Sequence, residues 1–183
     1  MMENKKPLLL HVCCAPCFPH VFRVLSERYR VTAFFFNPNV QPPEEYARRR
    51  DELENFCAGE GIPFIEGARD SGSWLEAVRG LENEPEGGKR CEACFRYRLA
   101  GTARLSAEAG FKYFTTTLTV SPLKNAGVIN AAGRDAAGRF GTEFLERDFK
   151  KKNGFKKSCE MSRKYGFYRQ NYCGCAFSLK KNP

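Results

Sequence analysis

Apolar residues in this chain alternate between short continuous runs and stretches where they recur at helical spacing. The continuous runs are typical of buried strands and fall at residues 7–13, 31–36, 64–65, 112–120 and 142–145. The helical stretches lie between or beside them, at residues 17–29, 44–59, 73–81, 91–109 and 121–138. Strands that alternate with helices favour right-handed βαβ units. We therefore predict an α/β fold with a doubly wound, mostly parallel sheet of about five strands.

The chain shows neither an internal repeat nor a clean linker. Its 183 residues are enough to bury a sizeable core, so we expect a single α/β domain over residues 1–183. Residues 147–183 differ from the rest because they are rich in basic and aromatic side chains. We expect this segment to pack on the domain as a C-terminal elaboration.

The formal net charge is +9, and the excess is uneven. Basic residues in the C-terminal segment are Arg147, Lys150, Lys151, Lys152, Lys156, Lys157, Arg163, Lys164, Arg169, Lys180 and Lys181. Aromatic residues interleaved with them are Phe149, Phe155, Tyr165, Phe167, Tyr168 and Tyr172. Such a stripe suits an RNA backbone with unpaired bases stacked on rings. A solvated basic face that keeps the protein soluble is the alternative.

The N-terminal apolar run is short, is broken by His11, and leads directly into cysteines. It therefore does not resemble a secretory signal. No run approaches the ~18 apolar residues that span a membrane. We expect a cytoplasmic protein without a membrane partner, whose thiols stay reduced and available to metal.

Three motifs follow strands of the predicted sheet. Cys13 and Cys14 end the first strand, Asn37-Pro38-Asn39 ends the second, and residues 119–124 end the fourth. In open parallel sheets, ligands bind outside the carboxyl ends of the strands. We therefore expect these segments to converge on one site.

Seven of the nine cysteines fall into tight clusters: Cys13-Cys14-x-x-Cys17, Cys91-x-x-Cys94 and Cys173-x-Cys175. Closely spaced thiolates are soft ligands, suited to zinc, copper(I) or iron–sulfur clusters, or to dithiol redox chemistry. We interpret Cys57 and Cys159, which stand apart, as packing residues. A set of structural disulfides is less favoured in a cytoplasmic chain.

The first two clusters together offer enough thiolates for a metal centre. Adjacent cysteines on a strand point to opposite faces, so Cys13 and Cys14 must lie where the strand gives way to a turn. Cys91 and Cys94 open a helix, whose N-terminus favours the thiolate form. Four thiolates suit a tetrahedral zinc or a [4Fe–4S] cluster. The spacing leaves open which of the first three cysteines bind metal, so the role of Cys17 is unassigned.

The spacing of the third cluster, Cys173-x-Cys175, indicates redox chemistry. A disulfide between Cys173 and Cys175 would be strained and easily reduced, and Gly174 would relieve the bend. Electron relay, chemistry in a substrate pocket and further metal ligation all remain open. Asp70 and Asp148 are isolated carboxylates that could bind iron or move protons, and a surface or capping role is the alternative. His11, inside the first strand, is expected to be a satisfied core group.

The chain lacks GxxxxGK[ST] and GxGxxG phosphate loops. Its motifs, in order, are LLLHVCCAPC, FFFNPNVQPPEEYARR, RCEACFRYRL, FTTTLTVSPLKN and DFKKKNGFKKSCEMSRKYGFYRQNYCGCAFS. Together they resemble the QueH-type epoxyqueuosine reductases from about residue 8 to residue 178. This family is similar in fold to the HUP (adenine-nucleotide α-hydrolase-like) group. Residues 13–17 stand here in place of the phosphate loop of that group. This replacement is consistent with a nucleotide-binding site that has become a metal-binding site.

The resemblance implies reduction of the epoxide of epoxyqueuosine to queuosine at the wobble position of the tRNA anticodon loop. It implies a cobalamin-independent enzyme with a [4Fe–4S] cluster and a further mononuclear iron. On this chain the implied cluster ligands are Cys13, Cys14, Cys91 and Cys94, and Asp148 is our choice for the iron ligand. Catalytic roles are expected for Cys173, Cys175, Tyr168, Tyr172 and Asp148. RNA binding is expected for Lys150, Lys151, Lys152 and Arg169.

Two other functions compete with this one. The first is an RNA-binding module stabilised by zinc, and the second is an ATP-dependent tRNA sulfur-transfer enzyme of the same fold. A brown protein after anaerobic purification would favour the reductase, and a colourless zinc protein would favour the module. The electron donor and the oligomeric state stay open.

Overall fold

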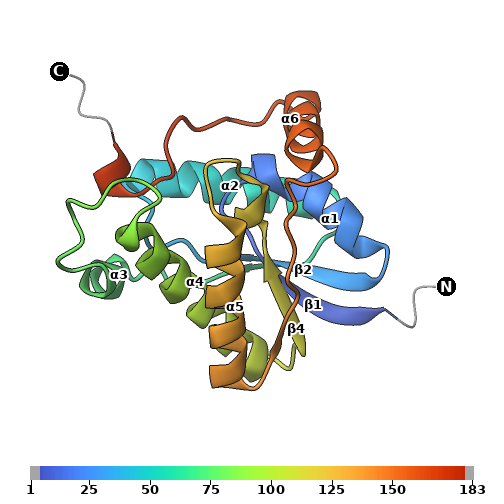
Figure 1. The fold of residues 1–183 in the computed structure, drawn as a ribbon. Coiled ribbons are helices and arrows are strands. Elements are labelled where there is room, and N and C mark those ends of the chain that lie inside the picture. Colours follow the sequence, from blue (N-terminus) through green and yellow to red (C-terminus); the bar gives the residue numbers. More distant parts are fainter. Residues whose placement is uncertain (1–4, 180–183) are drawn as a thin grey trace.

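The computed structural model describes residues 5–179, which form a parallel sheet covered by helices on both faces (Figure 1). Its strands, in chain order, are β1 (Lys6–His11), β2 (Tyr29–Phe35), β3 (Phe64–Glu66), β4 (Tyr113–Thr116) and β5 (Glu143–Phe144). They lie side by side in the order β3-β2-β1-β4-β5, and every neighbouring pair is parallel. The predicted α/β fold with about five strands is confirmed.

Strand β1 lies at the centre because it can bury side chains on both faces. Leu8 and Leu10 point into one core, while Leu9 points into the other. This alternation explains why the strand reads as a continuous apolar run. The same strand brings the residues that follow it to the middle of the sheet edge.

Helices divide between the two faces of the sheet. The core of Leu8 and Leu10 is covered by α1 (Phe18–Ser26) and α2 (Pro43–Gly59), and α6 (Gly154–Lys164) packs on α1 and η1. The core of Leu9 is covered by α4 (Lys89–Glu108) and α5 (Ala126–Phe140), and α3 (Ser71–Ala77) packs on α4. Short 3-10 turns are η1 (Ala15–Cys17), η2 (Thr117–Val120) and η3 (Ala176–Ser178).

Two element ends differ from the sequence prediction because side chains cap them. The strand expected over 112–120 ends at Thr116, whose hydroxyl accepts a hydrogen bond from Leu118 N at 3.1 Å and starts η2. The helix expected from residue 121 begins only at Ala126. Asn125 Oδ1 caps it by accepting from Gly127 N at 2.9 Å and Val128 N at 3.3 Å.

The C-terminal segment crosses the molecule above the sheet edge (Figure 1). After α6, residues 165–175 form what we call the C-terminal strap, which runs over α2 and ends at η3. A bridge between Val40 and Cys175, and a 2.7 Å hydrogen bond from Gln41 N to Gly174 O, fasten its end. Lys180 and Lys181 of the basic stripe lie outside the described residues.

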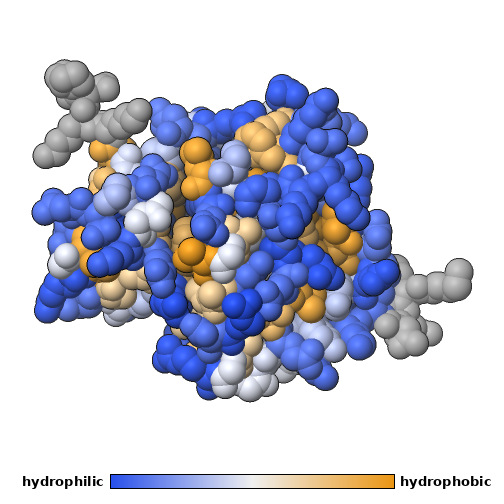
Figure 2. Space-filling view, viewed as in Figure 1, coloured by the Kyte–Doolittle hydropathy of each residue, from blue (hydrophilic) through white to orange (hydrophobic). Residues whose placement is uncertain are grey.

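Hydrophilic residues cover most of the face seen in Figure 2, and its hydrophobic patches are small and separate. Within residues 5–179, no helix combines the length and the apolar character that crossing a membrane requires.

Candidate functional site

A cavity of about 510 Å³ lies at the carboxyl ends of the strands. Its walls come from the loop after β1, the segment from η2 to Lys124, one face of α6 and the C-terminal strap. Beneath it, Asn37 Nδ2 donates to Val12 O at 2.9 Å and ties the end of β2 to the end of β1. The predicted convergence of these segments is confirmed. Five cysteines line the cavity: Cys13, Cys14, Cys17, Cys159 and Cys173.

Cys13, Cys14 and Cys17 form a compact thiol triad, with all three sulfurs within 4.8 Å of one another. Strand β1 ends at His11, so the backbone is free to turn, and Pro16 lies inside the turn η1. The sulfurs of Cys13 and Cys14 therefore lie 3.6 Å apart on one side, as expected for a strand end. This triad is the one group of metal-binding side chains of this density in the described part of the chain.

The three thiols of the triad differ in acidity. Hydrogen bonds from the Cys14 and Cys17 thiols, helped by Lys124 and Arg98, hold the pKa of Cys13 well below its usual range. The same hydrogen bonding to Cys13 raises the pKa of Cys14 to about 12 and raises that of Cys17. A thiolate held by two thiols is a starting point for metal binding, which displaces the remaining protons.

The other thiol group, which we call the strap group, joins α4 to the C-terminal strap. Cys94 and Cys175 are buried together against Trp74 and Val78, and Cys173 packs beside them. Cys91 lies one turn before Cys94 on α4. The structure therefore places the CxxC motif next to the CxC motif. Neither Cys91 nor Cys94 belongs to the compact triad.

Within the strap group, protonation is divided unequally. Hydrogen bonds from Cys175 and from Ser178 Oγ, which lies 3.0 Å from Cys173 Sγ, lower the pKa of Cys173 to about 5. The pKa of Cys175 is raised by its hydrogen bond to Cys173 and by burial. Cys91 was expected to be a thiolate at a helix N-terminus. Burial instead raises its pKa, outweighing a 3.2 Å hydrogen bond from Gly87 N.

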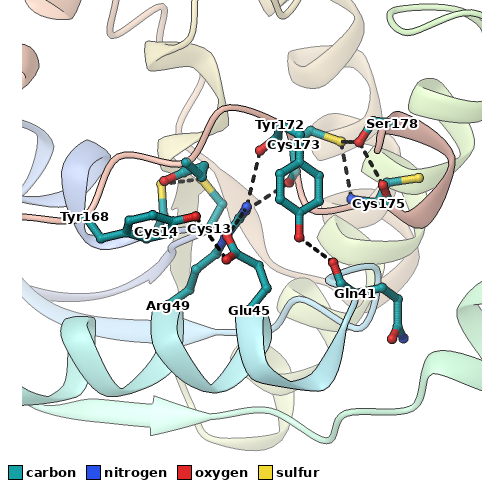
Figure 3. Close-up of polar contacts among 11 residues, drawn as sticks. Cys13, Cys14, Gln41, Glu45, Arg49, Tyr168, Tyr172, Cys173, Cys175 and Ser178 are labelled. Carbon is teal, nitrogen blue, oxygen red and sulfur yellow. Dashed lines mark hydrogen bonds and ion pairs between the residues drawn. The ribbon is translucent and has the colours of Figure 1, made fainter. Parts of the chain in front are cut away.

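A buried ion pair on α2 holds the strap between the two thiol groups (Figure 3). Arg49 is paired with Glu45 and donates to Cys173 O at 3.0 Å and Tyr172 O at 3.2 Å. Gly174 must lack a side chain here, because a Cβ would lie 2.9 Å from Arg49 Nη1 and its φ is +105°. Sequence reasoning missed Arg49; its signal was a Glu45–Arg49 pair at helical i,i+4 spacing.

The two tyrosines of the YRQNYCGC motif also anchor the strap. Tyr168 OH donates to Glu45 Oε2 at 3.2 Å, and its ring lies 3.4 Å from the Arg48 guanidinium. Tyr172 OH donates to Gln41 O at 2.5 Å. Burial raises the pKa of both phenols. Tyr172 lines the cavity, whereas Tyr168 is outside its lining.

Sequence comparison assigns the chain to a family. The profile of the family described as "Epoxyqueuosine reductase QueH" matches residues 8–181. The chain belongs to the QueH family. An Epoxyqueuosine reductase QueH of Streptococcus pyogenes serotype M1 is 42% identical over 97% of this chain and 72% of its own length. Proteins of the same name in Acinetobacter baylyi and Thermotoga maritima are 39% and 35% identical, over 97% and 94% of this chain and 83% and 90% of their own lengths.

The structure revises some of the expectations for this QueH-family chain and confirms others. Cys159, interpreted as a packing residue, lines the cavity and accepts a 3.3 Å hydrogen bond from Arg169 Nη2. Arg98, which sequence reasoning missed, is a buried cation in the same wall. Cys57 is buried in the core, as predicted. His11 is satisfied by Thr116 Oγ1 at 2.8 Å and Phe36 O at 3.1 Å, and burial lowers its pKa to about 3.

The carboxylates and lysines singled out in the sequence do not gather at the cavity. Asp148 is paired with Lys150 Nζ at 3.1 Å and is outside the cavity lining. Asp70 caps α3 by accepting from Ser73 N at 2.9 Å, the alternative role given for it above. Lys151 and Lys152 are exposed in the turn before α6. A metal role for Asp148 and an RNA role for the lysines therefore stay predictions.

Proposed function

We propose that this chain reduces the epoxide of epoxyqueuosine, carried in the anticodon loop of a tRNA, to the alkene of queuosine. The observation that carries the proposal is the thiol-lined cavity at the sheet edge, in a member of the QueH family. A cavity with several cysteines and few carboxylates suits electron transfer and soft metals better than hydrolysis.

The proposed reaction needs two electrons and two protons. Both epoxide carbon–oxygen bonds break, a carbon–carbon double bond forms, and the oxygen leaves as water. The electrons come in the end from an external low-potential donor protein. The protons come from acidic groups in the cavity or from water that enters it.

Thiolates are the ligands that a [4Fe–4S] cluster requires, and Cys13, Cys14 and Cys17 already lie together. In our proposal Cys13 and Cys14 bind it together with Cys91 and Cys94, which lie outside the triad, and Lys124 and Arg98 favour the thiolate form of Cys13. When bound, such a cluster supplies low-potential electrons and Lewis acidity. Cys17 lies as close to Cys13 and Cys14 as the metal-site geometry requires, so it is an alternative ligand to be tested with them. A further mononuclear iron with Asp148 would require Asp148 to leave Lys150.

Cys173 and Cys175 are proposed as the redox pair beside that centre. Oxidation of this thiolate–thiol pair to a disulfide releases two electrons and one proton, so its electrons match what reduction of one epoxide consumes, and the second proton comes from another acidic group of the cavity or from water. Cys173 lines the cavity and carries the lowered pKa, whereas Cys175 is buried behind it. A thiolate facing the substrate with a protonated partner is the arrangement that such a relay needs.

The tyrosines and cations have supporting roles in this proposal. Tyr172 lines the cavity and is the nearer candidate for proton donation, while Tyr168 orients Glu45 and the strap. Arg169 is exposed at the cavity and is suited to a phosphate of the substrate. Lys151 and Lys152 extend the positive surface towards the RNA backbone.

The test is conversion of the modified nucleoside. Anaerobically purified protein is incubated with a low-potential reductant and tRNA that carries epoxyqueuosine, and the digested nucleosides are identified by mass. We expect queuosine to appear with loss of one oxygen atom. The controls omit the reductant or use Cys14→Ser protein. Intact epoxyqueuosine with metal-loaded protein and reductant would refute the proposal.

A further inference from the structure

Exposed apolar side chains gather at the mouth of the thiol cavity. Leu123 is 77% exposed, the largest fraction among the exposed large hydrophobic residues described, and Phe155 is 40% exposed. Leu123 comes from the loop before α5 and Phe155 from the first turn of α6, and both line the cavity. Leu179, 44% exposed, lines it as well. Large apolar side chains left open at a cavity mouth mark a binding surface.

Phe155 differs from the other aromatic residues of the C-terminal segment. Phe149 is buried in the core, and Tyr165 and Phe167 stack on each other and contact Phe56 edge-to-face. Tyr168 and Tyr172 are held by the strap contacts described above. Among the described residues, Phe155 takes part in no aromatic pair or cation–π contact. Its ring is therefore available to a ligand.

Positive charge surrounds this apolar rim. Lys124, next to Leu123, and Arg169 both line the cavity, and Glu86 is its one acidic lining residue. Apolar or aromatic platforms flanked by cations fit a base and its phosphates in single-stranded RNA. A protein partner would need a larger continuous apolar area than these two side chains supply.

We propose that Leu123 and Phe155 bracket an unpaired base of the anticodon loop, adjacent to the modified base that enters the cavity. This inference rests on the proposed function and names the surface that holds the substrate. The side chains lie on a turn and on a solvent-facing helix position, so they can be changed without disturbing the core.

The experiment measures binding of a fluorescent anticodon stem-loop RNA to Phe155→Ala, Phe155→Trp and Leu123→Ala proteins. Stacking on one aromatic ring corresponds to a change in affinity of roughly 5- to 150-fold. We expect Phe155→Ala to bind the RNA weaker by a factor in that range, with an unchanged salt slope. Phe155→Trp should bind like the wild type, and Leu123→Ala should show a smaller loss.

Leu75→Ala is the matched control, because Leu75 is 47% exposed on α3 and lies outside the cavity lining. It should leave the affinity for RNA unchanged. Wild-type affinity in both Phe155→Ala and Leu123→Ala would overturn the inference. If those two variants bind RNA normally and still reduce the epoxide, the proposed function stands without this surface. If the wild type reduces no epoxide, the proposed function itself fails.

A different observation concerns Arg98. It is 3% exposed, lines the cavity, and shares a face of α4 with Cys91 and Cys94. Its Nη2 donates to Asn37 Oδ1, but its Nε has no partner, and no carboxylate in residues 5–179 lies within ion-pair distance. Arg49, equally buried, has Glu45. A buried guanidinium needs a compensating negative charge, and the cysteine-rich wall of the cavity that Arg98 lines, beginning with the Cys13 thiolate, is what supplies it.

We infer that Arg98 is a positioning residue whose charge offsets the negative charge of the thiolate-held metal centre; this too rests on the proposed function. The test compares the midpoint potential of the cluster in the wild type, Arg98→Lys and Arg98→Gln. Loss of the positive charge should disfavour the reduced cluster at least tenfold, which is 59 mV for one electron. Arg98→Lys should stay close to the wild type.

Lys124→Gln is the control, because Lys124 is only partly buried and its charge is screened by solvent. It should shift the potential less than Arg98→Gln does. Equal potentials in the wild type and Arg98→Gln would overturn the inference. If Arg98→Gln does not fold, Arg98→Lys decides the question. A midpoint potential 59 mV or more below that of the wild type in Arg98→Lys would show that positive charge is not what Arg98 supplies.

Discussion

The two thiol groups are built in different ways. The triad of Cys13, Cys14 and Cys17 comes from five consecutive residues at the end of the central strand. The strap group joins α4 to a segment about eighty residues later in the chain, and it exists only while the C-terminal strap stays docked. A local thiol cluster inherits the rigidity of the sheet, whereas an assembled one depends on tertiary contacts that a single substitution can remove.

Protonation is divided in the same way in both groups: Cys13 and Cys173 have lowered pKa values, and their hydrogen-bonding partners Cys14, Cys17 and Cys175 have raised ones. The groups differ in the number and packing of their sulfurs. Three sulfurs within 4.8 Å of one another suit metal binding, whereas a pair separated by one glycine suits thiol–disulfide chemistry. The four predictions that follow are ordered by expected effect, and each breaks or sharpens this division of roles.

The largest effect is expected at the proposed cluster ligands. Single Ser substitutions of Cys13, Cys14, Cys91 or Cys94 should lose most bound iron and all epoxide reduction. The fold should survive, because neither core of the sheet depends on metal. Iron and sulfide per chain, measured anaerobically beside far-UV circular dichroism, check this. Full iron content in Cys91→Ser with loss in Cys17→Ser would replace Cys91 by Cys17 in the ligand set.

Substitutions in the Cys173–Cys175 pair should affect turnover without affecting metal binding. Cys173→Ser and Cys175→Ser should keep iron close to the wild-type content but lower epoxide reduction by roughly a hundredfold or more, since general acid and redox groups typically contribute on that order. Single-turnover reduction and metal analysis of the same samples check this. Loss of the cluster in either variant would make that cysteine a ligand.

Docking of the strap should depend on Arg49. Arg49→Met leaves Glu45 buried without its partner and frees two strap carbonyls, a change expected to destabilise the fold by about 3–5 kcal/mol. Chemical denaturation measures the loss. Limited proteolysis should then cut the strap before the sheet. Arg50→Met is the control, because Arg50 forms more exposed ion pairs on the same helix and should matter far less.

A smaller effect concerns pH. Because the pKa of Cys173 is lowered to about 5, its thiolate is present at neutral pH and is lost only as the pH falls through that value. Alkylation of metal-free protein should therefore modify Cys173 at a nearly constant rate from pH 8 to pH 6. An alkylation rate that rises tenfold per pH unit across this range would show an ordinary thiol. Cys57, whose pKa burial raises to about 12, is an unreactive internal reference.

Part of this architecture is readable from the sequence, for physical reasons. The Leu8–Leu10 run predicts a strand buried on both faces, and residues at the ends of parallel strands must meet at one edge. The triad follows because Cys13 and Cys14 can share a side only beyond the strand. These features depend on local periodicity and on general rules of sheet topology.

Other features depend on contacts that no local pattern reveals. Glu45 and Arg49 lie in a helix rich in charge and read as solvent-exposed, yet the strap covers them. The packing of Cys94 against Cys175 and the position of Cys159 depend on how α6 and the strap cross the sheet edge. Nothing in the residues around Arg98 in the sequence distinguishes it from an exposed arginine, and only its burial beside thiols does so.

The most direct test of the division between the two thiol groups counts thiols across one turnover. Fully reduced, metal-loaded protein is mixed with tRNA carrying epoxyqueuosine in the absence of any other reductant, and free cysteines are then labelled and mapped by mass spectrometry. We predict that Cys173 and Cys175 become a disulfide in proportion to the queuosine formed, while the triad cysteines stay unoxidised. Queuosine formed with Cys173 and Cys175 still free would contradict the account.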